Sequence, residues 1–133
     1  MSRNLVNPAT LYDGAPVGMS QARVDPESGF VFVSGQVDWD VDSRVRHATL
    51  EGQAEGVMEH LITVLNEAGS SLEDVLQLRV YVLGELADGM SQLVPVFARH
   101  FGRSRPALTG VGVASLASRD TLIEIEALAK LRR

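Results

Sequence analysis

The chain has 133 residues, 45% of them hydrophobic and 22% charged, which predicts one globular domain spanning residues 1–133. Its net charge of −5, with scattered basic residues, argues against nucleic acid as a partner, and the absence of cysteine excludes disulfides and thiolate zinc sites. No apolar run approaches the roughly 20 residues that cross a bilayer, and no signal-peptide core is visible, so we expect a cytoplasmic protein without a membrane partner.

The first third of the sequence predicts a surface loop followed by a β-hairpin. Turn-forming pairs recur through residues 1–16, which are expected to be a loop. A short strand at 17–24 is expected to reach the apolar strand 30–34 through a turn containing Pro and Gly. This strand ends with Ser34, Gly35 and Gln36. A small residue followed by one without Cβ is typical either of a β-bulge or of a wall that a ligand approaches closely.

The middle of the sequence predicts two helices separated by a strand. Apolar residues at steps of three and four predict a helix over 48–68 that ends at Gly69, with His60 on its polar side. Ser70 and Glu73 form a capping-box pattern before an alternating strand at 75–83. The helix expected over 86–101 has a predicted buried stripe of Met90, Leu93 or Val94, Phe97, Ala98 and Phe101.

Two further strands are predicted in the last thirty residues, joined by a tight connection at 117–120. In the second strand the period of two places Glu124 and Glu126 on one face and Ile123 and Ile125 on the other. The two carboxylates are either a catalytic pair or an ion-paired strand face, and Arg79 is a candidate cross-strand partner.

These elements predict an α+β fold in which two helices pack on one face of a mixed β-sheet. The other face is rich in Val, Leu and Ile and has no helix to cover it. Because apolar faces of this kind are usually buried between subunits, we expect an oligomer.

Several segments in this order resemble the RidA family (YjgF/YER057c/UK114), the reactive-intermediate deaminases. They are Val31–Gln36, Val64–Val75, Pro106–Ala107 and Ile123–Ala129. The resemblance implies a RidA/chorismate mutase-like fold, a homotrimer with small-molecule clefts between subunits, and hydrolysis of enamines or imines. It also implies that Glu124 positions the attacking water and that Ser34, Gly35 and Gln36 form a wall of the cleft.

The sequence departs from the family pattern where the deaminases bind the substrate carboxylate. Their Pro-Ala-Arg-Ser motif is replaced by Pro106, Ala107, Leu108 and Thr109, which the resemblance places in the cleft. Leucine cannot form the bidentate pair that arginine makes with a carboxylate. Met19 stands at the position of the family tyrosine and Val94 at that of an asparagine, so the expected cleft is more apolar.

Two functions remain open from the sequence. If Arg105 or Arg103 replaces the missing arginine, enamine or imine hydrolysis is the expected reaction, and Arg105 is then a substrate-binding residue. If neither does, the chain is expected to be a noncatalytic small-ligand-binding or regulatory trimer. No phosphate-binding Gly loop or metal-ligand cluster is visible, so no cofactor and no metal are expected. RNA cleavage is disfavoured, because the three histidines form no acid/base pair pattern.

Overall fold

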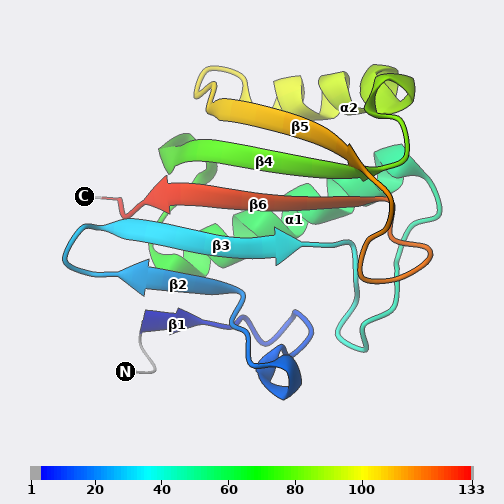
Figure 1. Cartoon of the computed structure of the whole chain (residues 1–133). Coiled ribbons are helices and arrows are strands. Elements are labelled where there is room, and N and C mark those ends of the chain that lie inside the picture. Colours follow the sequence, from blue (N-terminus) through cyan, green and yellow to red (C-terminus); the bar gives the residue numbers. More distant parts are fainter. Residues whose placement is uncertain (1–3, 133) are drawn as a thin grey trace.

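Residues 4–132 are described by a computed structural model, in which two helices pack on one face of a six-stranded mixed sheet (Figure 1). The expected α+β architecture is therefore confirmed. The helices are α1 (Leu50–Ala68) and α2 (Leu86–Phe101), and no helix in 4–132 is long and apolar enough to cross a membrane. The strands are β1 (Leu5–Val6), β2 (Ala22–Asp25), β3 (Phe30–Gln36), β4 (Val75–Leu83), β5 (Ala107–Val113) and β6 (Ile123–Lys130).

The strand order in the sheet is β1-β2-β3-β6-β4-β5, which places the last strand in the middle. The predicted hairpin of β2 and β3 is present, and β6 pairs antiparallel with both β3 and β4. The expected tight connection between β5 and β6 is wrong, because β4 lies between them and β5 runs parallel to β4. Parallel neighbours require a crossover, and α2 provides it here.

The two faces of the sheet differ as the alternation in β6 predicts. Ile123, Ile125 and Ala129 are buried on the helix-covered face. Glu124 and Glu126 alternate with them and lie on the face without helices, here called the open face. The sheet therefore presents its carboxylates on the side opposite to its hydrophobic core.

Helix α1 forms most of the helix side of this core. Thr49 caps its start by accepting a hydrogen bond from the Gly52 amide, and Gly69, with φ 88°, ends it in the left-handed region. The helix lies behind the sheet in Figure 1 and packs against β3 and β6. The predicted apolar stripe is buried at Ala54, Val57, Leu61, Val64 and Leu65.

His60 was expected on the polar surface of α1, and this prediction is wrong. The residue is only 9% exposed, and its Nε2 lies 2.8 Å from the carbonyl oxygen of Trp39. The loop 37–49 crosses this side of α1 and covers His60. The spacing of residues within the helix could not predict this contact, because the loop lies outside the helix. Burial lowers the pKa of the His60 imidazole.

The same loop is held to α1 by a buried carboxylate. The Asp38 side chain has no exposed surface; its Oδ1 accepts a hydrogen bond from Arg46 Nε at 2.8 Å, and its Oδ2 lies 2.7 Å from His47 Nδ1. A Cβ on Gly56 would lie 2.6 Å from Asp38 Cγ and 2.7 Å from Arg46 Nη2. Gly56 is therefore needed for the close approach of the loop 37–49 to α1.

Three local expectations are also corrected. The loop expected over 1–16 contains β1, which pairs with β2; residues 1–3 lie outside the described part. Ser71, not Ser70, is the N-cap residue of the helical turn at Leu72–Asp74, and its side chain does not cap the backbone: its Oγ donates to Asp74 Oδ2 at 2.7 Å, whereas Ser70 Oγ donates to the Lys130 carbonyl. Leu76 is 47% exposed, because a bulge near the start of β4 shifts the alternation.

Candidate functional site

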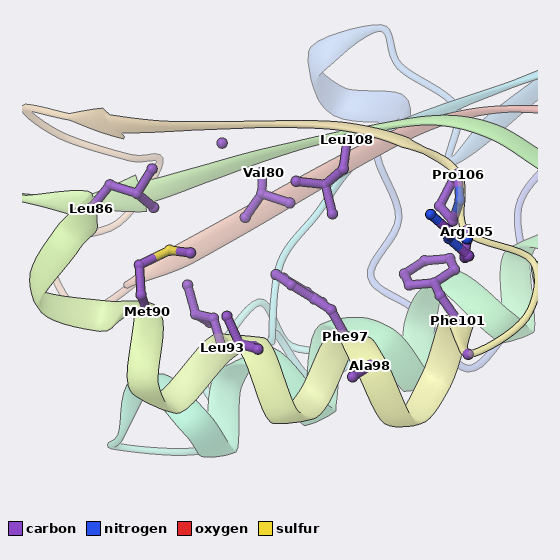
Figure 2. A pocket seen from close by; sticks show the side chains of 13 residues that line it. Val80, Leu86, Met90, Leu93, Phe97, Ala98, Phe101, Arg105, Pro106 and Leu108 are labelled. Atoms are coloured by element: carbon purple, nitrogen blue, oxygen red, sulfur yellow. The ribbon is translucent and has the colours of Figure 1, made fainter.

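An apolar groove of about 380 Å³ lies between α2 and β5 (Figure 2). It exists partly because Gly110, a β5 residue that borders the groove opposite α2, has no side chain. A Cβ on Gly110 would already lie 3.3 Å from Leu86. The lining is hydrocarbon except for one arginine: Val80, Leu86, Met90, Leu93, Val94, Phe97, Ala98, Phe101, Gly102, Arg105, Pro106, Leu108 and Gly110.

The groove also depends on how α2 is turned about its axis. Of the alternatives Leu93 and Val94, Leu93 is the buried one and Val94 is 51% exposed, but Met90, which was expected in the stripe, is 44% exposed and Ala98 is exposed as well. The predicted stripe is partly wrong, because α2 packs against α1 as well as against the sheet. A Cβ on Gly89 would lie 2.7 Å from Leu50, so the buried side of α2 is turned toward α1. The remaining apolar side chains border the groove.

Three predicted site residues lie together in this groove: Arg105, Pro106 and Leu108. Leu108 pairs with Leu78 in β4 and shares its helix-side face. Arg105 has a φ of 44°, which is unusual for a residue other than glycine. Figure 2 shows Arg105 beside Phe101 and Pro106 at one end of the groove, with Leu86 and Met90 at the other.

The other predicted residues of the Pro-Ala-Leu-Thr segment lie on the opposite side of the sheet. Thr109 pairs with Arg79, and Arg79 pairs with Glu126 across β4 and β6. Arg79 Nη1 lies 3.9 Å from Glu126 Oε1, and the Tyr81 hydroxyl donates to the same carboxylate. The Glu126 hydrogen bond raises the pKa of the Tyr81 phenol. The expected cross-strand partnership of Arg79 is therefore with Glu126.

Glu124 lies on the open face beside the end of β3, in a different environment from Glu126. A Cβ on Gly35 would lie 2.6 Å from the Glu124 carboxyl carbon, so only glycine leaves room there. Glu124 is partly buried, and no side chain in 4–132 donates to it or pairs with it. Burial first, and the Glu126 charge second, raise the pKa of Glu124.

Met19 and Ser34 line a second hollow, on the open face, of about 720 Å³, together with Glu126. Ser34 Oγ donates to the Ser20 carbonyl at 2.6 Å, which ties β3 to the segment before β2. Gln36 is 2% exposed, and its amide nitrogen donates to Gln21 Oε1 at 3.0 Å. The Gln36 side chain therefore supports the wall of this region from inside the protein.

Tyr12 belongs to the same region and was missed from the sequence. Its hydroxyl lies 3.8 Å from Met19 Sδ, and its ring packs on Trp39 with centroids 5.0 Å apart. Burial and the charge of Glu124 both raise the pKa of the Tyr12 phenol. No sequence pattern signals this, because Tyr12 lies in an irregular segment brought to Met19 by tertiary folding.

The predicted site residues thus form two groups in one chain. Arg105, Pro106 and Leu108 border the groove on the helix side, whereas Met19, Gly35 and Glu124 lie on or beside the open face. The sheet separates the groups. Within residues 4–132, no group of three His, Asp or Glu side chains is arranged to hold a metal ion.

Replacing Gly35 with alanine is expected to displace the Glu124 carboxyl while leaving the fold intact. The added methyl group meets a flexible, partly exposed side chain, so we expect the free energy of unfolding to fall by no more than about 1–2 kcal/mol. Chemical denaturation measures this change. Gly18→Ala is a useful comparison, because nothing lies within 4 Å of the added Cβ and only its φ of 77° opposes it. A loss above about 4 kcal/mol for Gly35→Ala would contradict this account of the contact.

The fold and site define a small α+β protein with a free carboxylate on the open face of its sheet and an apolar groove beneath its second helix. The family model described as endoribonuclease L-PSP matches residues 15–131. The chain therefore belongs to this family, the RidA (YjgF/YER057c/UK114) family.

Individual relatives agree with this assignment. A RutC family protein of Pyrococcus abyssi is 38% identical over 101 residues, covering 75% of this chain and 77% of the relative. The crystal structure of Mmf1, a yeast protein whose curated name includes "mitochondrial", matches with a TM-score of 0.86 at 28% identity, covering 96% of this chain and 98% of that one. RidA of a Psychrobacter species matches with a TM-score of 0.81 at 27% identity, covering 95% and 98%.

Proposed function

We propose that this protein is a divergent RidA-family homotrimer that hydrolyses small enamines or imines to keto compounds and ammonia in clefts between subunits. The observation that carries the proposal is Glu124, a partly buried carboxylate with a raised pKa and no donor in the described chain. Glu126, by contrast, is engaged by Tyr81 and Arg79. Two carboxylates in different environments are typical of a site that uses only one of them for proton transfer.

Assembly would bring the two groups of site residues together. Leu108 and Arg105 lie on one side of the sheet and Glu124 on the other, so one chain cannot place them around one ligand. The open face exposes Phe32 by 52%, Leu5 by 40% and Val111 by 39%, which favours its burial against further copies. We propose that the groove of one subunit meets the open face of the next, with each 133-residue chain acting as one domain.

The chemistry requires only water and a proton acceptor. The reacting form is the protonated imine, which an enamine reaches when its carbon takes a proton from solvent. The water oxygen forms a bond to the imine carbon, one water proton passes to the Glu124 carboxylate, and the C=N π electrons move to nitrogen, which gives a neutral amino alcohol. Glu124 returns this proton to nitrogen and then accepts the hydroxyl proton as the C–N bond breaks, so that ammonia leaves, a carbonyl group remains, and Glu124 loses its proton to water. Tyr12, with a phenol that burial keeps protonated, is placed to donate a hydrogen bond in the same region.

The test is the rate of ammonia release from 2-aminoacrylate generated in place by a dehydratase, compared with the uncatalysed rate. Because the Glu124 pKa is raised, we expect activity to be full at neutral pH and to fall as the pH drops through a midpoint above the ordinary value of 4.5. Initial rates between pH 4 and pH 8 measure the midpoint, with the dehydratase kept in excess. A rate equal to the background at every pH would overturn the proposal.

The second candidate is a noncatalytic ligand-binding or regulatory trimer. It is favoured by one observation, the hydrocarbon lining of the groove where the family deaminases carry their carboxylate-binding arginine. Saturable ligand binding without ammonia release would favour this function.

The endoribonuclease description of the family suggests RNA cleavage, which we do not favour. Each of the three histidines contacts a different residue, so they are not paired as a general acid and base. The contacts are His60 with Trp39, His47 with Asp38, and His100 with Glu55. RNA binding that weakens steeply with salt would support that activity instead. A cytoplasmic location stays a prediction.

A further inference from the structure

Trp39, the only tryptophan of the chain, lies where three segments distant in the sequence meet. Its carbonyl oxygen lies 2.8 Å from His60 Nε2 in α1, and its indole Nε1 donates to Thr121 Oγ1 at 3.0 Å. Its ring packs on Tyr12 with centroids 5.0 Å apart. In Figure 1 the loop that follows β3 runs beside the connection that leads into β6. One partly buried side chain therefore joins the segment of Tyr12 to the strand that carries Glu124.

The chain around Thr121 is firmly held to α1. Thr121 has no exposed surface, and both of its neighbours are bound by the side chain of Gln53, which lies in α1 and is 1% exposed. Gln53 Nε2 donates to the Asp120 carbonyl oxygen at 2.8 Å, and Gln53 Oε1 accepts from the Leu122 amide at 2.8 Å. Because buried hydrogen bonds of this kind rigidify the structure, the Thr121 hydroxyl is a fixed point just before Glu124.

The hydrogen-bond directions at Thr121 also suit Trp39. Ser118 Oγ donates to Asp120 Oδ1 at 2.8 Å, so the short contact between Ser118 and Thr121 uses the proton of Thr121. The oxygen of Thr121 is then an acceptor, which the indole N–H requires because it can only donate. This bond fixes the orientation of the Trp39 ring.

Tyr12 lies in an irregular segment between β1 and β2, and it rests on the Trp39 ring. Its backbone carbonyl accepts from Gln21 Nε2 at 3.0 Å, and its hydroxyl makes a weak contact with Met19 Sδ at 3.8 Å. Burial first, and the Glu124 charge in addition, raise the pKa of the Tyr12 phenol, so the hydroxyl lies near that carboxylate. The orientation of the Tyr12 ring therefore depends on its packing against Trp39.

We propose that Trp39 is a positioning residue that holds the Tyr12 hydroxyl at a fixed place beside the Glu124 carboxylate, with Thr121 and α1 as its support. This inference rests on the proposed function, for which it names the residue that keeps a hydrogen-bond donor and a proton acceptor in one geometry. A misplacement of about 1 Å can cost about a hundredfold in rate. Trp39 acts through Tyr12 and not on the substrate itself.

Thr121→Val tests this support, because valine has the shape of threonine but cannot accept the indole proton. We expect kcat for ammonia release to fall about tenfold to a hundredfold while KM changes by less than about twofold. Thr121→Ser keeps the hydroxyl and is the matched control, with a kcat expected within about threefold of the parent. Trp39→Phe keeps an aromatic ring beside Tyr12 but loses the N–H, so it is expected to resemble Thr121→Val.

The same substitution in the Tyr12→Phe background separates positioning from a general effect on the fold. If Trp39 acts through the Tyr12 hydroxyl, Thr121→Val lowers kcat by less than about twofold once that hydroxyl is absent. A general loosening of the fold would lower kcat equally in both backgrounds. That result, or a Thr121→Ser variant as impaired as Thr121→Val, overturns the inference.

A second measurement requires no catalysis. In Tyr81→Phe, Tyr12 is the only tyrosine, and its ring signals in NMR spectra are expected to move as Glu124 titrates between pH 4 and pH 8. Glu124→Gln is expected to abolish this movement, and Thr121→Val to reduce it to less than about half, because the effect of a charge falls with distance.

The NMR titration also distinguishes failure of the inference from failure of the proposed function. Tyr12 signals that do not move in Tyr81→Phe, or that move equally after Thr121→Val, overturn the inference whether or not ammonia is released. Conversely, a protein that shows the expected NMR dependence but releases no ammonia would retain the support of Tyr12 by Trp39 and lose the proposed reaction.

Discussion

Glu124→Gln is expected to lower the rate of ammonia release by about a hundredfold to ten-thousandfold, the usual contribution of a general base. Glutamine has nearly the shape of glutamate, so it fills the space beside Gly35, but it cannot accept a proton from water. Initial rates with 2-aminoacrylate at pH 7 measure the effect. A loss of less than about threefold would show that Glu124 is not the base.

The matched control is Glu126→Gln, on the same strand and the same face. Since Glu126 is a secondary cause of the raised pKa of Glu124, its neutralisation is expected to shift the pH midpoint downward while hydrolysis at pH 7 continues. An unchanged midpoint in Glu126→Gln would contradict the electrostatic coupling of the two carboxylates.

Glu124→Gln is expected to lower activity but not stability. A carboxyl group whose pKa is raised by folding binds its proton more tightly in the folded state than in the unfolded state. Its charged form therefore opposes folding once the pH rises through the folded pKa, and the full stability is present below the unfolded pKa. Glu124→Gln removes this cost, so we expect it to be at least as stable as the parent at pH 7, as measured by urea denaturation.

Gly56→Ala is expected to lower the free energy of unfolding by about 2–4 kcal/mol. The new methyl group would displace Asp38 from Arg46 and His47, and disrupting a buried ion pair costs about 3–5 kcal/mol, offset by about 1 kcal/mol of helix propensity. Denaturant titration monitored by circular dichroism measures the change.

Asn66→Ala is the control for helix propensity, because Asn66 is exposed on α1. It is expected to change the free energy of unfolding by about 0.5 kcal/mol or less, toward greater stability. If Gly56→Ala is also stabilising, the loop 37–49 moves away from the helix more easily than the buried Asp38 indicates.

Local periodicity was sufficient to predict the helices, the alternation in β6 and the shared face of Glu124 and Glu126. It could not predict that β4 separates β5 from β6, because strand order depends on contacts distant in the sequence. The burial of His60 and the position of Tyr12 beside Met19 also depend on irregular segments that cross other elements. These segments leave no repeating pattern in the sequence.

For the candidate site, the types of residue could be predicted from the sequence, but not which of these residues lie together in the fold. Gly112 in β5, for example, does not border the groove, and a Cβ on it would lie 2.2 Å from the Gly84 carbonyl oxygen. Gly112 is thus required for packing against the chain that enters α2. The separation of Leu108 from Glu124 by the sheet follows from the parallel register of β4 and β5, which no local motif specifies.

The central position of β6 affects how the chain becomes ordered during synthesis. β6 is synthesised after the other five strands of the sheet, but it joins β3 to β4, with Phe30 paired to Lys130 and Val80 paired to Ile125. Until it is available, the hairpin of β2 and β3 and the β4-α2-β5 unit have no strand to connect them. Native pairing of β3 and β4 therefore waits until β6 has been synthesised, and the nascent chain exposes the edges of these two strands to chaperones or to incorrect partners in the meantime.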